Sequence, residues 1–522
     1  MPVLKLNSLQ SLFFALEERQ IEIFTRRLVI IMRDGSFTLS QQRRVWEILK
    51  KVSSLTKTSS FVYALASSLV AMESQDIAEK RQITLELINM TQVPEIDSEL
   101  LELIAGSTVN LLFEDELSLE EKKELLNQLH RMTLFRNATP ETINIYARGL
   151  FNISVDEPTV EGKRGYTSRL RTLALYGKGT VTTMIHAGKA LVNLACFTQI
   201  EGERIRCIST LETLLRKPRA NTELKHIYVS GLVNFITDET NQETFRNRYF
   251  RKLKKIAQAP DATWVIRKMY AQALLCMALY TENIQEKRRY VREIIKLVEM
   301  PECVTDIFVT AARAIFNHQI DENSLKRKKV CIKWLENLLE RSGNAQPILW
   351  EYARSLVNIA IDDPIYENKR HYSTLLLKLT ELRSPSLDIV LEYAKSLLNL
   401  ALSEESNEQK IQDLTTLLNI DRDIHYRRTN LAEKTPVNYL CVRAEALALM
   451  LRLEHDPLER RKILSRIPPL TEIKESEYFP VFMEIYNDSL KEEKDWSIKN
   501  RMIDLLDNIR QMLHDNTIRE DR

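Results

Sequence analysis

The stretch YARSLVNIA at 352–360 decides the fold, because variants of it recur along the chain. Close copies are YARGLFN at 146–152, YVSGLVN at 228–234 and YAKSLLN at 393–399. Aligned on the asparagine, the copies follow one another at steps of 41 or 42 residues. This asparagine column consists of Asn110, Asn152, Asn193, Asn234, Asn317, Asn358 and Asn399, with Cys276 at the corresponding position between Asn234 and Asn317. Self-similarity at a fixed period of this length is typical of a repeat array.

Weaker copies extend the array to Ala71 and to Leu449. We therefore expect about ten repeats of about 41 residues. The last step is longer, which indicates an insertion near 421–436. Residues 1–55 and 455–522 do not follow the columns. Since the terminal repeats of an array must cover an apolar face, we predict helical caps at 1–55 and 455–522 around an array at 56–454.

The residue three positions before the asparagine column, here the −3 column, is small in every copy. Its members are Ser68, Ser107, Gly149, Ala190, Gly231, Ala273, Ala314, Ser355, Ser396 and Ala446. Small residues at one column of a helix let neighbouring helices approach closely. A second apolar segment precedes each copy and opens with basic residues, such as Lys287-Arg288-Arg289 and Lys369-Arg370. Each unit is therefore predicted to contain a first helix, a loop and a second helix.

The composition favours an all-helical chain that folds. Only 11 of 522 residues are glycine, about 2% where about 7% is usual, and 44% are hydrophobic. Lys and Arg total 74 against 72 Asp and Glu, which argues against a protein that coats nucleic acid by bulk charge. No apolar run approaches the roughly 18 residues that span a bilayer. The six cysteines are scattered and form no CxxC pair, so a reducing, cytoplasmic location is expected.

The phrases ARSLVNIA at 353–360 and AKSLLNLA at 394–401 resemble the last helix of armadillo repeats, and the period also suits HEAT repeats. The chain lacks the Gly-containing turn of armadillo first helices, and also the Trp that importin-type repeats carry four residues before the Asn. The resemblance implies a right-handed superhelical α-solenoid of two- or three-helix repeats. It also implies that the asparagine column lines a concave groove for a peptide.

A helical wheel predicts which face of the second helix is open. The columns at −6, −5, −2, −1, +1, +2 and +3 are mostly apolar or small and are expected to be buried, including the aromatic −6 column of Tyr146, Tyr228, Tyr270, Tyr352 and Tyr393. The polar columns are the asparagines, −4 and +4. The −4 column carries Arg148, Lys189, Arg313, Arg354 and Lys395, and the +4 column carries Glu114, Asp156, Asp238, Asp321 and Asp362. A narrow polar strip, expected to be the concave surface, is therefore predicted.

The polar strip allows two interpretations. Asparagine is a mediocre helix residue, so seven in one mid-helix column need another reason. Each amide either holds the backbone of an extended bound peptide or forms a ladder from repeat to repeat. The −4 cations either contact acidic side chains of a ligand or stitch each repeat to the next aspartate.

No sequence motif indicates catalysis. The eight histidines are dispersed, and the chain has no GxSxG, P-loop, GxGxxG or metal-ligand spacing, so we expect no catalytic residue, metal or cofactor. The prediction is a non-enzymatic protein-interaction scaffold that holds a partner protein or an extended peptide, of undetermined oligomeric state. The alternative is a HEAT-like nucleic-acid-binding protein that uses the basic openings of the first helices. Those cations could instead form a salt-bridge network with the acidic loops.

Overall fold

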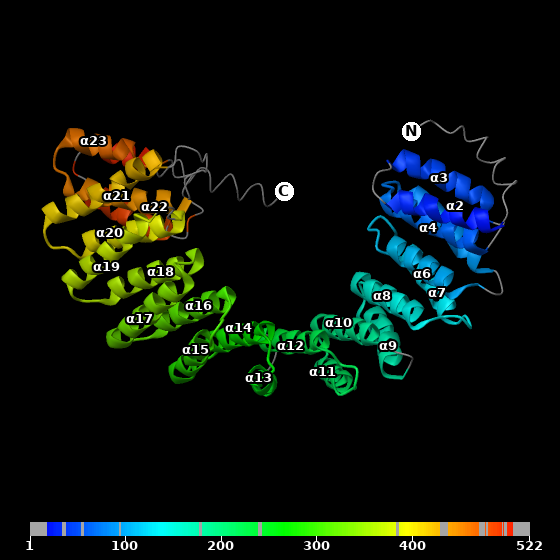
Figure 1. Cartoon of the computed structure of the whole chain (residues 1–522). Helices are drawn as coiled ribbons and strands as arrows, with labels where there is room; N and C mark the ends of the chain where they lie inside the picture. Colours follow the sequence, from blue (N-terminus) through cyan, green and yellow to red (C-terminus); the bar gives the residue numbers. More distant parts are fainter. Residues whose placement is uncertain are drawn as a thin grey trace. The chain divides into compact units, whose positions relative to one another are not determined.

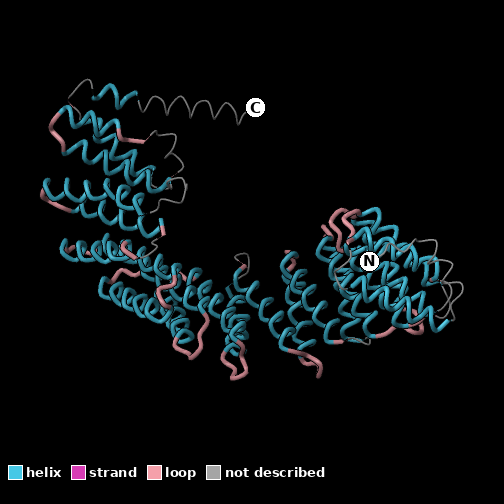
Figure 2. Tube along the Cα trace, turned by 45° about the horizontal axis from the view of Figure 1, so that its top comes forward, coloured by secondary structure: helices cyan, strands magenta, loops and turns pink. Residues whose placement is uncertain are grey.

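A computed structural model of the chain describes residues 18–33, 38–53, 57–92, 96–176, 180–238, 243–382, 386–427, 437–468, 476, 479–492, 494 and 498–504. Within these ranges the chain is built from helices joined by loops, and it contains no strand (Figure 2). The all-helical prediction is thus confirmed for the described residues. The first 17 residues, the last 18 and the core of the expected insertion, at 428–436, lie outside them.

The helices that carry the asparagine column alternate with the helices that open with basic residues. We call the first set B helices: α4 (Lys57–Glu73), α6 (Ser98–Leu112), α8 (Pro140–Asp156), α10 (Val181–Phe197), α12 (Thr222–Thr237), α14 (Trp264–Tyr280), α16 (Thr305–Asp321), α18 (Gln346–Asp362), α20 (Leu387–Ser403) and α22 (Val437–Leu453). The A helices are α3 (Leu39–Val52), α5 (Ile77–Asn89), α7 (Leu119–Thr133), α9 (Val160–Tyr176), α11 (Glu201–Leu215), α13 (Glu243–Ala257), α15 (Ile284–Val298), α17 (Leu325–Ser342), α19 (Tyr366–Thr380) and α21 (Asn407–Arg427). A 3₁₀ turn (Met90–Gln92) follows α5, and α2 (Glu18–Arg33), α23 (Pro457–Ser465) and α25 (Phe479–Glu492) lie towards the ends. Each repeat in the described residues thus has two helices.

The chain divides into two compact units, Met1–Met269 and Tyr270–Arg522, and the division falls inside α14. In the N-terminal unit the B helices α4, α6, α8, α10 and α12 pack on one another in order. In the C-terminal unit α16, α18, α20 and α22 do the same. Figure 1 shows α16 and α18 in one layer, with α15 and α17 in the other. The asparagine column therefore places one residue on each successive B helix, near its C-terminal end. Handedness, repeat number and the limits of the caps remain predictions.

Local sequence explains where these helices begin and end. Thr139 caps α8 by accepting hydrogen bonds from the backbone of Glu141 and Thr142, and Pro140 stands at the first helical positions, where no backbone N–H is needed. At the other end of a repeat, α17 stops at Gly343, whose φ of 65° is left-handed backbone that glycine adopts without strain.

The −3 column packs at the contact between helices, as predicted. All of its members are buried. A Cβ added at Gly231 would lie 3.2 Å from Ile208 Cδ1 and 3.2 Å from Val192 Cγ2. Contacts this short mean that even a methyl group at Gly231 would require Ile208 or Val192 to shift, so the small column allows neighbouring helices to approach closely.

The −6 tyrosines are buried, which confirms that they belong to the core. Their hydroxyl groups also reach the A helices. Tyr228 donates to Glu212 over 2.7 Å, and Tyr352 donates to Glu336 over 3.0 Å. The same column thus supplies apolar area and a polar link between the two layers.

Candidate functional site: the asparagine strip

The asparagine column lies at the surface of the B-helix layer. Each of its seven side chains is half-buried, and none is fully buried. A column of this kind has one edge covered by the neighbouring B helix and one edge open to solvent. What distinguishes its members is therefore the hydrogen bonding of each amide.

In the N-terminal unit, three column asparagines bond to a neighbouring repeat. Asn110 accepts a hydrogen bond from Arg148 Nη2 over 2.9 Å. Asn152 donates to the backbone oxygen of Leu112 over 3.5 Å, and Asn234 donates to Cys196 Sγ over 3.2 Å. These three asparagines therefore bond from repeat to repeat, as in a ladder. Their partners, however, are backbone, thiol and guanidinium groups rather than other asparagines.

The C-terminal unit differs. Asn317 donates to the carbonyl of Arg313 in its own helix, over 2.8 Å. The Nδ2 atoms of Asn358 and Asn399 are buried and have no hydrogen-bond partner among the described residues. A buried amide donor without a partner costs about 1–3 kcal/mol, so these two groups are suited to receive an acceptor from outside the chain.

The −4 cations lie beside the asparagines in both units. Arg148 is exposed, and its guanidinium lies 4.7 Å from the centre of the Phe113 ring. Lys189 pairs with Glu223 over 3.2 Å. These contacts reach from one B helix to the next, so the N-terminal part of the strip is partly occupied by its own side chains.

In the C-terminal unit the −4 cations pair with buried glutamates. Arg354 lies 3.2 Å from Glu351, and Lys395 lies 2.9 Å from Glu392. Arg313 approaches Glu351 only to 3.8 Å, and 56% of its side chain is exposed. Burial raises the pKa of Glu351, an effect that the two neighbouring guanidinium groups oppose. Arg313 is the most available cation of this group.

Sequence reasoning missed Glu351 and Glu392. Both stand seven residues before a column asparagine and are only 3% and 5% exposed. On the helical wheel a residue at −7 lies within about 20° of the asparagine, so two full turns of helix connect them. The wheel contained this signal, but only the columns nearest the asparagines were assigned to the strip. The interpretation in which the −4 cations form ion pairs with +4 aspartates of the next repeat is wrong, because the described contacts of these cations are with other groups.

The +4 acids pair instead with basic residues at the openings of the A helices, within the same repeat. The pairs, each separated by 34 residues, are Lys80–Glu114, Lys122–Asp156, Arg204–Asp238, Lys287–Asp321 and Lys328–Asp362. Where the +4 residue is not acidic, the same lysine finds another partner: Lys163 lies 4.7 Å from the centre of the Phe197 ring, and Lys369 donates to Ser403 over 2.9 Å. We call these contacts the A–B clamp. They engage the cations that the nucleic-acid alternative would need.

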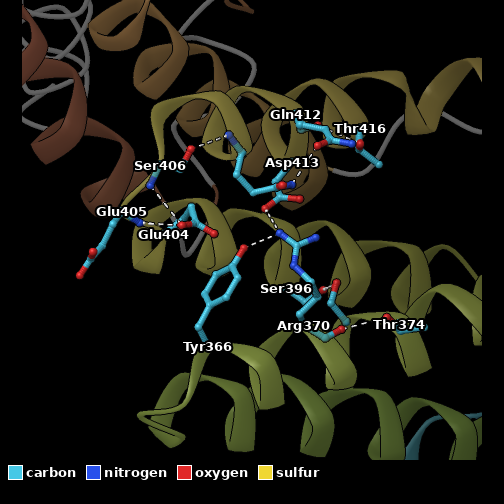
Figure 3. A network of polar contacts seen from close by, with 12 residues as sticks. Tyr366, Arg370, Thr374, Ser396, Glu404, Glu405, Ser406, Gln412, Asp413 and Thr416 are labelled. Carbon is cyan, nitrogen blue, oxygen red and sulfur yellow. Dashed lines mark hydrogen bonds and ion pairs between the residues drawn. The ribbon is translucent and has the colours of Figure 1, made fainter.

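The A helices carry a second set of polar links, between repeats. Arg370 donates to Tyr366 in its own helix and, over 2.9 Å, to Asp413 of α21 (Figure 3). Arg164 of α9 likewise bonds Glu203 of α11. This layer is therefore held together by ion pairs, whereas the B-helix strip keeps two amides unpaired.

The +3 column was predicted to be buried, and this prediction is wrong. Its members Phe113, Val155, Cys196, Thr237, Leu279, Ile320, Ile361 and Leu402 are all exposed. The column stands in the last turn of each B helix, where no following turn covers it, and on the wheel it lies only about 20° from the open −4 column. The strip is thus wider than predicted, and one of its edges is apolar over much of its length.

The comparisons with known proteins bear only on overall resemblance. No protein-family model and no curated protein matches the sequence. One solved structure, from work on a phosphorylation switch that controls the interaction between cadherin and beta-catenin, aligns with a TM-score of 0.38 and 14% identity, over 97% of this chain and 99% of the other. A homology model of the full-length AP-3 complex in an intermediate open conformation aligns with a TM-score of 0.37 and 13% identity, over 96% and 92%.

Two further features are relevant to function. In the part of the chain that the structure describes, no helix is long and apolar enough to cross a membrane. In the same part, no group of three or more His, Cys, Asp or Glu side chains is placed to hold a metal ion.

Proposed function

We propose that this protein is a non-catalytic, cytoplasmic interaction scaffold that holds an extended segment of a partner protein along the asparagine strip. The proposed contact residues are the seven column asparagines together with Arg148, Lys189, Arg313, Arg354 and Lys395. The observation that carries the proposal is the pair of buried, unpartnered Nδ2 atoms of Asn358 and Asn399. These groups recur at the same position of adjacent B helices, as a repeated recognition element would.

An extended backbone is the ligand that suits these amides. Its carbonyl groups are not hydrogen-bonded within the segment, so each can accept from one asparagine. The −4 cations beside them favour acidic side chains on the ligand. Nucleic acid is less well suited, because five basic residues at the openings of the A helices are already paired with carboxylates.

Selection from a library of random twelve-residue peptides displayed on phage tests the proposal. The wild-type chain should enrich a set of peptides, and an N358A/N399A double variant should bind synthetic versions of them about tenfold or more weakly, because two hydrogen bonds of about 0.5–1.5 kcal/mol each are lost. The matched control is N317A, whose amide bonds to its own helix and should matter less.

The thermal melting temperature of the double variant should stay at or slightly above that of the parent, since alanine is the better helix former. Failure to enrich any peptide, or equal binding by the double variant, would contradict the proposal. Duplex DNA binding with a steep dependence on salt concentration would favour the nucleic-acid alternative instead.

A further inference from the structure

The exposed +3 residues of the C-terminal unit form a regular apolar row. Ile320, Ile361 and Leu402 are 48%, 57% and 54% exposed. They stand on α16, α18 and α20, which pack consecutively. Single exposed aliphatic residues are ordinary on a protein surface, but three at one position of successive repeats define a continuous apolar edge.

This row runs beside the groups already proposed to bind a partner. Each member stands three residues after a column asparagine in the same helix, and the unpartnered amides of Asn358 and Asn399 lie in the same strip. A ligand on this surface would therefore meet, once per repeat, an amide donor and an aliphatic side chain. The ligand must offer an acceptor and an apolar group at the same interval.

The interval decides which backbone conformation fits. Packed helices lie about 8–10 Å apart, so the ligand must repeat at about that distance. A polyproline II segment rises about 3.1 Å per residue with three residues per turn, and it therefore presents every third side chain on one face at about 9.3 Å. A β-strand alternates its side chains, so residues three apart point to opposite faces. An α-helix offers a similar interval every seventh residue, but its carbonyls are bonded internally.

The charges of this part of the strip indicate the remaining side chains of the ligand. Arg313, Arg354 and Lys395 pair with Glu351 and Glu392, and Arg313 is largely exposed. Lys369 of the A–B clamp is matched by a hydroxyl group rather than by a carboxylate. Asp321 and Asp362 beside the row are balanced by Lys287 and Lys328, so these groups together carry an excess of positive charge, which complements acidic residues on the ligand.

We propose that the C-terminal unit binds an acidic polyproline II segment with an aliphatic side chain at every third residue, which packs along Ile320, Ile361 and Leu402. This inference rests on the proposed function, because it assigns the conformation and the side-chain period of the segment that the asparagines hold. The N-terminal unit is not equivalent, since its +3 column is interrupted by Cys196 and Thr237.

Fluorescence anisotropy with synthetic peptides provides the test. The probe is a labelled peptide of four Leu-Glu-Pro triplets, which favours polyproline II and places leucine at every third residue. It should bind the wild-type chain at least about tenfold more tightly than a peptide of the same composition with scrambled order. It should also bind more tightly than a helix-forming peptide of equal charge with leucine at every seventh residue. A peptide of four Leu-Lys-Pro triplets, which reverses the charge, should bind more weakly as well.

The variant I320A/I361A/L402A, which adds no hydrogen-bond acceptor beside the asparagines, should abolish the preference for the ordered peptide over the scrambled one. The three side chains are exposed, so the melting temperature of this variant should be close to that of the parent, and V155A in the N-terminal unit is the matched control. N358A/N399A should weaken the ordered and scrambled peptides alike.

Two outcomes separate this inference from the proposed function. If phage-selected peptides bind through Asn358 and Asn399 while the ordered peptide shows no advantage, the period-three inference is overturned and the proposed function stands. If no peptide of any kind binds, both fail. Tighter binding of the helical peptide, or a dimer of the chain that I320A/I361A/L402A dissociates, would also overturn the inference.

Discussion

The asparagine column behaves differently in the two units, although its residue is the same. In the N-terminal unit Asn234 donates to Cys196 of the preceding repeat, whereas in the C-terminal unit the Nδ2 atoms of Asn358 and Asn399 have no partner among the described residues. The residue at +3 of the preceding repeat accounts for this difference. It is a thiol before Asn234, but it is Ile320 before Asn358 and Ile361 before Asn399.

Asn193 and Asn317 follow the same pattern, whereas Asn152 reaches the backbone oxygen of Leu112 although Phe113 stands at +3 before it. Val155 stands at +3 before Asn193, whose side chain makes no hydrogen bond in the described residues, and Leu279 stands at +3 before Asn317, which bonds to its own helix. An aliphatic side chain cannot accept a hydrogen bond, so the next amide has no side-chain acceptor at this position of the preceding repeat. The side chain one repeat earlier therefore influences whether a column asparagine finds a partner.

The largest expected effect comes from larger side chains in the −3 column. It tests whether the two units pack alike although their asparagines bond differently. G231L in the N-terminal unit and A314L in the C-terminal unit should each lower the free energy of unfolding by about 1–3 kcal/mol or more, because the −3 column has no room for a larger side chain. Chemical denaturation measures both.

The control is G202A, since a Cβ at Gly202 would meet no atom within 4 Å. This variant should be neutral or up to about 1 kcal/mol more stable, because alanine restricts the unfolded chain. Strong destabilisation by G231L alone would mean that the units differ in packing and not only in their asparagines.

The second prediction concerns pH. Burial raises the pKa of Glu445, at the −4 position of α22, to about 7. Because the folded-state pKa lies above the unfolded one, the contribution of Glu445 to stability is fully present below about pH 4.5 and declines as the pH rises through 7. E445Q should remove this decline, which amounts to at most about 3 kcal/mol. Unfolding free energies of E445Q and parent, measured at pH 5 and pH 8, give the comparison.

His186 in the N-terminal unit gives the opposite dependence. Burial, together with Lys189 and Arg148, lowers the pKa of its imidazole to about 4. The neutral ring is the folded form, so its contribution is present above about pH 6.5 and is lost as the pH falls through 4. H186F should therefore weaken the acid sensitivity that E445Q leaves in place. Equal pH profiles for both variants would contradict these assignments.

The third prediction uses the A–B clamp, which is common to both units. Lys122 and Lys328 are buried, while their partners Asp156 and Asp362 are partly exposed. D156N and D362N should each cost about 1–3 kcal/mol, because each leaves a buried ammonium group poorly compensated. K122M and K328M should cost less, since the carboxylate left behind stays partly hydrated. Urea denaturation of the four variants should show this asymmetry in both units. Equal losses of unfolding free energy in the aspartate and lysine variants would mean that burial of the lysine does not determine the cost of breaking the A–B clamp.

The smallest expected effect comes from exchanging polar and aliphatic residues at the +3 column between the two units. C196I should free the amide of Asn234 and lower stability by about 0.5–1.5 kcal/mol, the net value of one hydrogen bond. I320S should supply Asn358 with an acceptor and reduce peptide binding, with little change in melting temperature. T237S, a conservative change in the same column, is the control. Unchanged peptide binding by I320S would show that the +3 residue does not govern the amide.

Much of the fold was predictable because several columns of the repeat hold the same kind of residue in successive copies. The buried small column from Ser68 to Ala446 and the buried tyrosines from Tyr146 to Tyr393 follow from helical spacing alone, and the structure confirms both. Helical spacing describes one helix, however, and the strip depends on several. It assigned Ile361 to the core, although the last turn of a helix lacks the cover that a middle turn has.

The partners of the polar columns were harder to predict for a similar reason. One interpretation paired each −4 cation with the aspartate of an adjacent repeat, but Asp362 pairs with Lys328 on the adjacent A helix and Arg354 with Glu351 one turn earlier. Pairing across helices depends on which ends lie side by side. The first helix of a repeat opens where the second one ends, so the shared end holds the ion pair.

The buried tyrosines link the protonation of a side chain to the integrity of the repeat. Tyr228 and Tyr352 can donate to Glu212 and Glu336 only while their phenol groups keep the proton, and burial with the neighbouring carboxylate raises both pKa values. Stability from these groups is present below about pH 10 and is lost in stronger alkali. An alkaline titration followed by phenolate absorbance would show the pH at which the tyrosines ionise. The buried ones would ionise together with the loss of helical circular dichroism, so their colour change would report the separation of the two helix layers.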